Sequence, residues 1–225
     1  MTEPIQVLAQ GLLNSSSSGS NAHRSAIAKR TMDLTLDVLL LLVALPIMLI
    51  VALYILLTSG RPVIFQQSRV GLHGNTFTML KFRTMIPDAE SMREGLRDER
   101  PNFGEQAPTF KMTSDPRISR GGAVLRRWSL DELPQLFNVL GGSMSLVGPR
   151  PHTAHDVADY LDSTHERLEV LPGITGPWQV GGRCELSGDE SLRLDLDYVR
   201  HGWYAIDAAI LLRTIRAVVS GRGAM

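Results

Sequence analysis

The chain has 225 residues, of which 44% are hydrophobic, and its 23 basic and 23 acidic side chains leave no net charge. That length allows one ordinary domain with appendages, and the charge balance provides no field that would attract nucleic acid, so no nucleic-acid partner is expected. The single cysteine, Cys184, excludes an internal disulfide framework and a four-thiolate metal site, and is typical of a reducing compartment.

Residues 1–28 are predicted to form a disordered tail. They contain the serine-rich run NSSSSGSN at 14–21, which cannot bury enough apolar surface to fold. The order of a signal peptide, a basic start followed by a short apolar core and a small-residue cleavage site, is not found there. The sequence therefore divides into this tail, a membrane-associated segment at 29–60 and a folded domain at 61–220.

Residues 34–57 are apolar on every helical face, with Asp37 and Pro46 among the few interruptions. About 20 apolar residues suffice to cross a bilayer, so a spanning helix is one interpretation and a buried core helix is another. Cations flank both ends of the run, and cations favour the cytoplasmic side. Because Pro46 removes a backbone donor near the middle, we predict a re-entrant helix-break-helix that enters one leaflet and returns.

A small hairpin is predicted next. Residues 62–65 resemble a strand, 71–74 a turn, and 77–85 a second strand of alternating character. Lys81 and Arg83 lie two residues apart and therefore share one face of that strand. A contact with phosphate or lipid headgroups and a solvated basic face explain this pattern equally well.

Two further helices are predicted toward the C-terminus. Residues 153–171 have the spacing of an amphipathic surface helix. Residues 203–219 form a largely apolar helix, which suits either the membrane interface or packing against the core. Between them, residues 172–183 form a loop rich in glycine and proline that carries Trp178 and ends at Arg183.

The densest group of opposite charges lies at 125–151. The adjacent carboxylates Asp131 and Glu132 follow Arg127, and Arg150 stands between two prolines. Apolar neighbours predict a position at the margin of the core, where a low dielectric strengthens each interaction. A carboxylate can attack phosphorus or hold a divalent metal, and arginines neutralise phosphate oxygens, so this group indicates phosphate chemistry.

A structural interpretation of the acidic pair competes with the chemical one. Ser129 and Glu132 fit the S-x-x-E capping box, in which acidic residues of the first turn are favoured by the helix dipole. The two interpretations are compatible, because a helix N-terminus also binds phosphate. Pro134 has no backbone N–H, so the regular helix is expected to begin later than the box suggests.

Taken together, the motifs resemble those of the bacterial sugar transferases, the monotopic phosphoglycosyl transferases that start lipid-linked glycan assembly. They span residues 29–214 in the order of the family. The motifs are KRTMDL from Lys29, the proline-interrupted apolar run, KFRTM from Lys81, LRRWSLDELPQLFNVLGGSMSLVGPRP from Leu125, PGITGPWQVGGR from Pro172 and LDLDYV from Leu194.

This resemblance implies transfer of a phosphosugar from a nucleotide diphosphate sugar, usually a UDP-sugar, to undecaprenyl phosphate, with release of the nucleoside monophosphate. It implies a covalent phosphosugar on Asp131, with Glu132 helping Asp131 to hold Mg²⁺. Arg150 would bind a phosphate of the polyprenyl substrate or of the intermediate. Further candidates for substrate or phosphate contacts are Lys81, Arg127, Arg183 and Asp195, although Asp197 could occupy the position of Asp195.

The resemblance also implies an α/β fold: a helix-rich, irregular catalytic domain with a re-entrant membrane helix-break-helix and interfacial helices. The family breaks this helix at a Ser-Pro pair, which here is Leu45-Pro46. The expected location is the cytoplasmic face of the bacterial inner membrane, in contact with membrane lipid, and a homodimer is compatible with it. The alternatives are a membrane-tethered scaffold without activity and a conventional glycosyltransferase that uses the D-x-D of Asp195 and Asp197.

Overall fold

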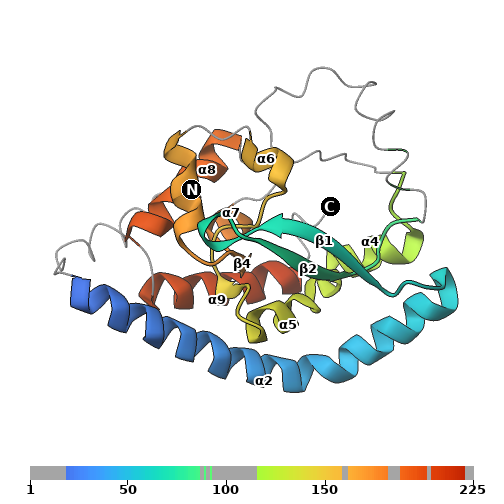
Figure 1. Ribbon diagram of the computed structural model, residues 1–225. Helices are drawn as coiled ribbons and strands as arrows, with labels where there is room; N and C mark the ends of the chain where they lie inside the picture. Colours follow the sequence, from blue (N-terminus) through green and yellow to red (C-terminus); the bar gives the residue numbers. More distant parts are fainter. Residues whose placement is uncertain are drawn as a thin grey trace.

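A long N-terminal helix lies beneath a group of shorter helices and strands (Figure 1). This computed structural model describes residues 19–86, 89, 92, 116–158, 162–181, 188–201 and 204–220. Of the predicted tail, residues 1–18 lie outside the described part, whereas helix α2 (Gly19–Ser59) already begins inside the range predicted to be disordered. Polar composition alone therefore did not mark the start of this helix.

Helix α2 does not confirm the predicted break. It continues through Pro46 as one helix of 41 residues. Figure 1 shows it bowed, with its convex side away from the rest of the molecule and both ends turned toward it. A proline removes one backbone donor and crowds the preceding turn, which bends a helix without ending it when the neighbouring turns keep their hydrogen bonds.

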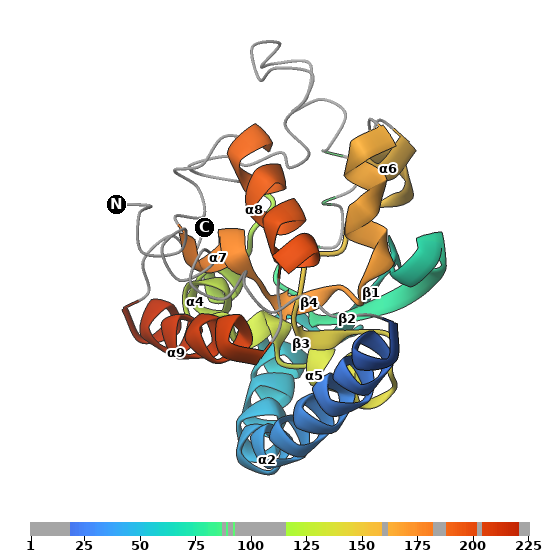
Figure 2. The ribbon, with the colours of Figure 1, turned by 90° about the vertical axis from the view of Figure 1, so that its left-hand side faces the viewer.

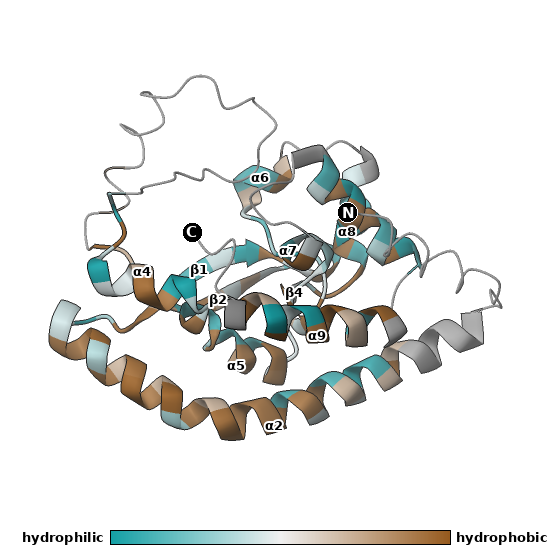
Figure 3. Ribbon diagram, turned by 180° about the vertical axis from the view of Figure 1, so that it is seen from behind, coloured by the Kyte–Doolittle hydropathy of each residue, from teal (hydrophilic) through white to brown (hydrophobic). Residues whose placement is uncertain are grey.

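One face of α2 packs against the rest of the molecule. Its buried apolar side chains recur every three or four residues, as expected for a helix with one covered face. They are Leu41, Ala44, Met48, Val51 and Ile55. The remaining faces expose large apolar side chains, among them Leu49 at 70% and Leu57 at 76% (Figure 3). Among the described helices, the stretch Ala26–Ser59 has the length and apolar character needed to cross a membrane.

The predicted hairpin is confirmed. Strands β1 (Ile64–Val70) and β2 (Thr76–Phe82) pair antiparallel around the short 3-10 turn Leu72–Gly74. Arg83, just after β2, donates hydrogen bonds to the carbonyl oxygens of Ser59, Gly60 and Arg61 at the end of α2. It therefore caps the membrane-associated helix, whose last carbonyls have no partner within the helix.

The remaining elements form a mixed arrangement of short helices around a second small sheet. Strands β3 (Ser145–Val147) and β4 (Gly173–Thr175) pair in parallel. The helices are α4 (Arg120–Arg127), η2 (Leu130–Glu132), α5 (Gln135–Leu140), α6 (Ala154–Ala158), η3 (Asp162–Glu169), α7 (Pro177–Gly181), α8 (Gly188–His201) and α9 (Tyr204–Ser220). The α/β class with predominant helix is thus confirmed, and α9 confirms the predicted C-terminal apolar helix.

The single helix predicted over 153–171 is not found. The structure has α6 and the 3-10 segment η3 instead, and residues 159–161 between them lie outside the described part. Asp162, Ser163 and Thr164 open the second segment, and such side chains compete with the backbone for hydrogen bonds in a regular helix.

The core lies where α5 meets α2, β2 and β3. Both Figure 1 and Figure 2 place α5 between α2 and the hairpin. Val139, Met144 and Val147 are completely buried there. This packing holds the acidic pair, just before α5, close to the strand that carries Lys81.

Candidate active site

The acidic pair lies in a tight turn between α4 and α5. Ser129 adopts a left-handed conformation (φ 53°) and its side chain makes no capping hydrogen bond, so the predicted capping box does not form. Regular helix resumes only at Gln135, with Pro134 at its N-cap, as expected from the missing N–H of proline. Asp131 and Glu132 are therefore presented by a tight turn, and neither side chain is used to cap a helix.

Two cations meet on one oxygen of Glu132. Lys81 Nζ from β2 lies 3.1 Å from Glu132 Oε1, and Arg150 Nη2, from the loop after β3, lies 2.9 Å from the same atom. Three predicted residues from two motifs, one beginning at Lys81 and one at Leu125, are thus brought together by the fold. Charge-assisted hydrogen bonds of this kind are among the stronger polar interactions in proteins.

The pKa shifts of this cluster follow from its charges. Burial raises the pKa of Glu132, but the positive charges of Arg150 and Lys81 outweigh it and lower the pKa to about 2. Burial lowers the pKa of Lys81, with Glu132 opposing that shift. Glu132 is accordingly ionised at every pH at which the protein would work, and it serves as the counter-ion of both cations.

Asp131 is the carboxylate without a direct cationic partner. It is 8% exposed, and within the described part of the chain no donor forms a hydrogen bond to its carboxylate. Burial and the neighbouring Glu132 raise its pKa, while Lys81, Arg126 and Arg150 lower it. A carboxylate of raised basicity whose oxygens are not occupied, surrounded by cations, has the properties of a nucleophile toward phosphorus.

The arginine of α4 that acts on Asp131 is Arg126, which the sequence analysis did not select. Its Nε donates to Thr84 Oγ1 at 2.9 Å, and its charge lowers the pKa of Asp131. The predicted candidate Arg127 is exposed at the end of the helix. Two adjacent arginines look alike in a sequence, and only the rotation of α4 about its axis distinguishes them.

Asn138 is a second residue that sequence reasoning missed. Its side chain accepts a hydrogen bond from Leu80 N at 3.0 Å and donates one to Thr78 O at 2.7 Å, which ties α5 to the strand that carries Lys81. An asparagine within the apolar run QLFNVL was the available signal, because a buried amide needs partners.

The loop that carries Arg150 is fixed along its backbone. Four successive carbonyl oxygens, from residue 149 to residue 152, each accept a hydrogen bond. The donors are, in chain order of the acceptors, Gly173 N at 2.9 Å, Arg167 Nη2 at 3.2 Å, Arg69 Nη1 at 3.3 Å and Val70 N at 2.9 Å. A loop held in this way presents the Arg150 guanidinium from a fixed position.

The two residues of the D-x-D have different environments. Asp197 is exposed, whereas Asp195 is 1% exposed and forms an ion pair with Arg167, with Nη2 2.6 Å from Oδ2. Burial raises the pKa of Asp195 to about 6 although Arg167 lowers it. The structure therefore places Asp195 in a buried ion pair with Arg167, which also donates to the carbonyl oxygen of Arg150, and a substrate contact of Asp195 stays a prediction. The remaining candidate, Arg183, lies outside the described residues.

The two carboxylates of the acidic pair suit Mg²⁺ when substrate phosphates and water supply the remaining ligands. Asp131 and Glu132 supply two adjacent carboxylates, and Oε1 of Glu132 is the oxygen occupied by Lys81 and Arg150. Among the described residues, no group of three His, Cys, Asp or Glu side chains suited to a metal is found. Mg²⁺ in phosphate sites commonly takes one or two carboxylates together with substrate phosphates and water, so these carboxylates suit an ion that arrives with a diphosphate.

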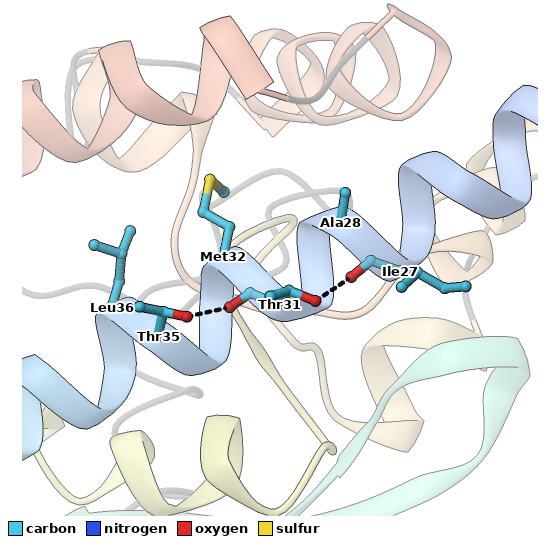
Figure 4. A pocket seen from close by; sticks show the side chains of 6 residues that line it. All are labelled: Ile27, Ala28, Thr31, Met32, Thr35 and Leu36. Carbon is cyan, nitrogen blue, oxygen red and sulfur yellow. Dashed lines mark hydrogen bonds between the residues drawn. The ribbon is translucent and has the colours of Figure 1, made fainter.

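A hollow along the N-terminal half of α2 has a different character (Figure 4). Its lining includes Ile27, Met32 and Leu36, and none of its lining residues belongs to the cluster around Glu132. Thr31 and Thr35 also line it, but their hydroxyls donate to carbonyls of their own helix. The hollow therefore offers an apolar surface with no group suited to catalysis.

The chain is similar to proteins of known families over nearly its whole length. Residues 24–221 match the family described as bacterial sugar transferase. The chain is 40% identical over 201 residues to the undecaprenyl-phosphate galactose phosphotransferase of Salmonella typhimurium, covering 89% of this chain and 42% of that protein. It is 36% identical over 198 residues to the exopolysaccharide production protein ExoY of Sinorhizobium fredii, covering 88% of each.

A third relative, the undecaprenyl-phosphate glucose phosphotransferase of Komagataeibacter xylinus, is 40% identical over 209 residues, which cover 88% of this chain and 37% of that protein. The chain thus spans less than half the length of both phosphotransferases and most of the length of ExoY. The named sugars differ between these relatives, so the similarity does not identify one donor.

Proposed function

Because this chain belongs to the bacterial sugar transferase family, we propose that it transfers a phosphosugar from a nucleotide diphosphate sugar, most simply a UDP-sugar, to undecaprenyl phosphate. The products would be a polyprenyl diphosphate sugar and UMP. The observation that carries the proposal is that the two carboxylates differ in their partners. Glu132 binds Lys81 and Arg150, and Asp131 keeps its carboxylate oxygens available. Exopolysaccharide assembly, named for the relative ExoY, is the process we assign to it.

The first half of the reaction uses Asp131 as the nucleophile. An oxygen of its carboxylate bonds to the sugar-bearing phosphorus, and the bond from that phosphorus to the bridging oxygen breaks. The bridging oxygen leaves with the electron pair as part of UMP. Lys81, Arg150 and the nearby Arg126 supply positive charge for the phosphate oxygens, which is the main task of a protein in phosphoryl transfer.

The second half regenerates the enzyme. An oxygen of undecaprenyl phosphate bonds to the same phosphorus, and the Asp131 carboxylate leaves with the electron pair. Arg150 is the residue we assign to the lipid phosphate, because its loop is fixed and its side chain is 27% exposed. Asp131 and Glu132 are the residues that would hold Mg²⁺ when the nucleotide sugar binds, and the ion would supply positive charge for the departing UMP of the first half.

The membrane arrangement follows from the apolar surface. Helices α5 and α9, which contact α2 or are bonded to it, also expose large apolar side chains. These are Phe137, Leu140, Leu212 and Ile215. We propose that this surface and the convex side of α2 enter one leaflet from the cytoplasmic face of the inner membrane. The bow of α2 supports this re-entrant arrangement because it keeps both ends of the helix on one side (Figure 1).

The test is nucleotide release by purified protein with undecaprenyl phosphate, Mg²⁺ and a panel of UDP-sugars. We expect UMP from wild type with one or a few donors and none from Asp131→Asn. Before lipid is added, wild type incubated with the productive donor should gain the mass of a sugar phosphate. Release of UDP in place of UMP would indicate a conventional glycosyltransferase. If folded wild type releases neither nucleotide with any donor of the panel, a scaffold role or another nucleotide is favoured. Equal release of UMP by Asp131→Asn and wild type would exclude the covalent mechanism.

A further inference from the structure

We propose that Arg167, held by Asp195, is a positioning residue that fixes Arg150 against Glu132. The two N–H groups of one Arg167 guanidinium nitrogen connect Asp195 with the backbone of Arg150. Arg167 Nη2 donates to Asp195 Oδ2 at 2.6 Å and to the carbonyl oxygen of Arg150 at 3.2 Å. Arg167 thus joins α8 to the backbone of the very residue whose side chain reaches the acidic pair.

Burial makes this connection rigid. The side chains of Arg167 and Asp195 are 4% and 1% exposed, so neither exchanges its partner for water at low cost. Removal of one member would leave the other charge buried without compensation. Arg167 is therefore committed to a single geometry, which is the property that a positioning residue needs.

The second terminal nitrogen of the Arg167 guanidinium contacts the same loop at His152. Arg167 Nη1 lies 3.1 Å from His152 Nδ1, and an arginine only donates, so this ring nitrogen accepts. Burial, together with Arg167, Arg69 and Arg150, lowers the pKa of His152 to about 2, and the ring stays neutral. Arg167 consequently contacts the loop at Arg150 and again two residues later.

The consequence for the acidic pair is geometric. Arg150 Nη2 lies 2.9 Å from Glu132 Oε1, and a shift of the loop by a fraction of that distance would weaken the ion pair. Because the backbone of Arg150 is held by Arg167, loss of the Arg167 guanidinium should weaken the ion pair between Arg150 and Glu132. The members of this chain of contacts are far apart in sequence, which explains why no motif indicated it.

A matched control pair exists in the same two elements. Arg200 of α8 and Glu166 of η3 form a bidentate ion pair with contacts of 2.7 and 2.9 Å, parallel to the one between Asp195 of α8 and Arg167 of η3. The side chains of Arg200 and Glu166 are 48% and 35% exposed, and within the described residues neither forms a hydrogen bond or ion pair with the Arg150 loop. A substitution of Arg200 therefore measures how much the attachment of α8 to η3, as such, contributes to the unfolding midpoint.

The decisive measurement is a double-mutant cycle in thermal unfolding of the full chain in detergent or nanodiscs, which needs no substrate. Glu132→Gln is made in wild type, in Arg167→Lys and in Arg200→Lys. A lysine keeps the charge that pairs with Asp195 but cannot contact Asp195, Arg150 and His152 together. We expect Glu132→Gln to lower the unfolding midpoint less in the Arg167→Lys background than in wild type, and equally in Arg200→Lys and wild type.

An equal effect of Glu132→Gln in all three backgrounds would overturn the proposal. So would the same reduced effect in Arg167→Lys and in Arg200→Lys, because it would show that general attachment of α8 is responsible. If Arg167→Lys does not fold, Asp195→Asn enters the cycle in its place. It retains an oxygen acceptor for Arg167 and removes the charge that fixes its geometry, so the same reduction is expected.

An activity measurement extends the inference and rests on the proposed function. Arg167→Lys should lower kcat/KM for UMP release by about 10- to 100-fold, since misplacement of a substrate-orienting group by about 1 Å costs that much. Arg200→Lys should retain the wild-type rate. Absence of UMP from wild type would reject the proposed function and leave the unfolding cycle to decide the positioning role, whereas wild-type rates in Arg167→Lys would reject that role itself.

Discussion

At the scale of single residues, Asp131 and Glu132 are neighbours in sequence with opposite electrostatic environments. Glu132 lies against Lys81 and Arg150, and its pKa falls from its ordinary 4.5 to about 2. The pKa of Asp131 rises above its ordinary 3.8 through burial and the charge of Glu132. One carboxylate therefore stabilises the fold by being ionised, and the other is ionised at a cost to stability.

Neutral substitutions of the two carboxylates should change stability in opposite directions. A lowered folded-state pKa contributes stability that is present above the unfolded value, so Glu132→Gln should destabilise the protein at neutral pH by about 1–3 kcal/mol. This loss should shrink as the pH falls from 4.5 toward about 2. A raised pKa acts in reverse, so Asp131→Asn should stabilise the protein at neutral pH, and the gain should vanish below about pH 3.8.

Thermal unfolding of both variants from pH 3 to pH 8 measures this contrast. Asp131→Asn is also the variant expected to lose transfer, so a stabilised and inactive protein would separate catalysis from folding. A lower unfolding temperature for Asp131→Asn than for wild type at neutral pH would contradict our description of its environment.

Sequence reasoning identified the residues that touch the acidic pair and missed those that hold them. Glu132 and Arg150 belong to one densely charged stretch that indicated phosphate chemistry, whereas Lys81 was selected through the resemblance to the family. The choice of Arg126 over Arg127 and the role of Arg167 depend on how α4 and η3 are rotated and packed. That information resides in tertiary contacts, which local patterns of charge and hydropathy do not contain.

At the scale of elements, segments with one strong hydropathy pattern were predicted correctly, whereas the effect of residues that interrupt a helix was not. The alternating hairpin and the apolar α9 formed as expected. Helix α2 continues through Pro46 where a break was expected, because one missing donor is a small loss in a helix of 41 residues. The amphipathic spacing over 153–171 extended across residues that the structure divides between α6 and η3.

The contact between α5 and β2 is the element-level feature that sets the distance from Lys81 to Glu132. Asn138→Ala would leave Leu80 N and Thr78 O without their partner, which should cost about 1–3 kcal/mol and lower the rate of UMP release. Chemical denaturation and the nucleotide assay measure the two effects.

Ser143→Ala is the matched control for Asn138→Ala. Ser143 Oγ accepts from the amide nitrogen of Asn138 and donates to the backbone oxygen of Asn138, both at 3.2 Å, and among the described residues it forms no hydrogen bond with β2. This variant should lose less stability and keep its rate. Equal rates for the two variants would mean that Asn138 does not position Lys81.

At the scale of the whole molecule, the first and last described helices, α2 and α9, are joined through a buried polar network. Lys29 of α2 donates to Asp207 of α9 at 2.7 Å, and Tyr198 of α8 donates to the other oxygen of Asp207 at 2.8 Å. Lys29 precedes the apolar run, and its charge is used inside the protein, where it fixes the start of α2 to the C-terminal helix. The membrane-associated helix and the catalytic elements are therefore one structural unit, and the orientation of α2 in the bilayer also orients the acidic pair.

This coupling gives the topology of α2 a direct consequence for access to the substrates. If both ends of the helix stay at the cytoplasmic face, the acidic pair meets a soluble nucleotide sugar and the phosphate of a membrane lipid from the same side. Single cysteines test this in a Cys184→Ser background. Ile27→Cys and Ser59→Cys lie at exposed positions near the two ends of α2, and Leu49→Cys lies at an exposed apolar position in the interior of the helix.

We expect an impermeant thiol reagent to label Ile27→Cys and Ser59→Cys in inverted membrane vesicles and neither of them in intact spheroplasts. Leu49→Cys, 70% exposed in the protein, should stay unlabelled in both preparations because lipid covers it, and should react once detergent is added. Labelling of one end from each side would establish a spanning helix, and labelling of Leu49→Cys without detergent would place this part of α2 outside the bilayer. In the re-entrant arrangement, the bow of α2 would itself keep the nucleotide and lipid phosphates on one side of the membrane (Figure 1).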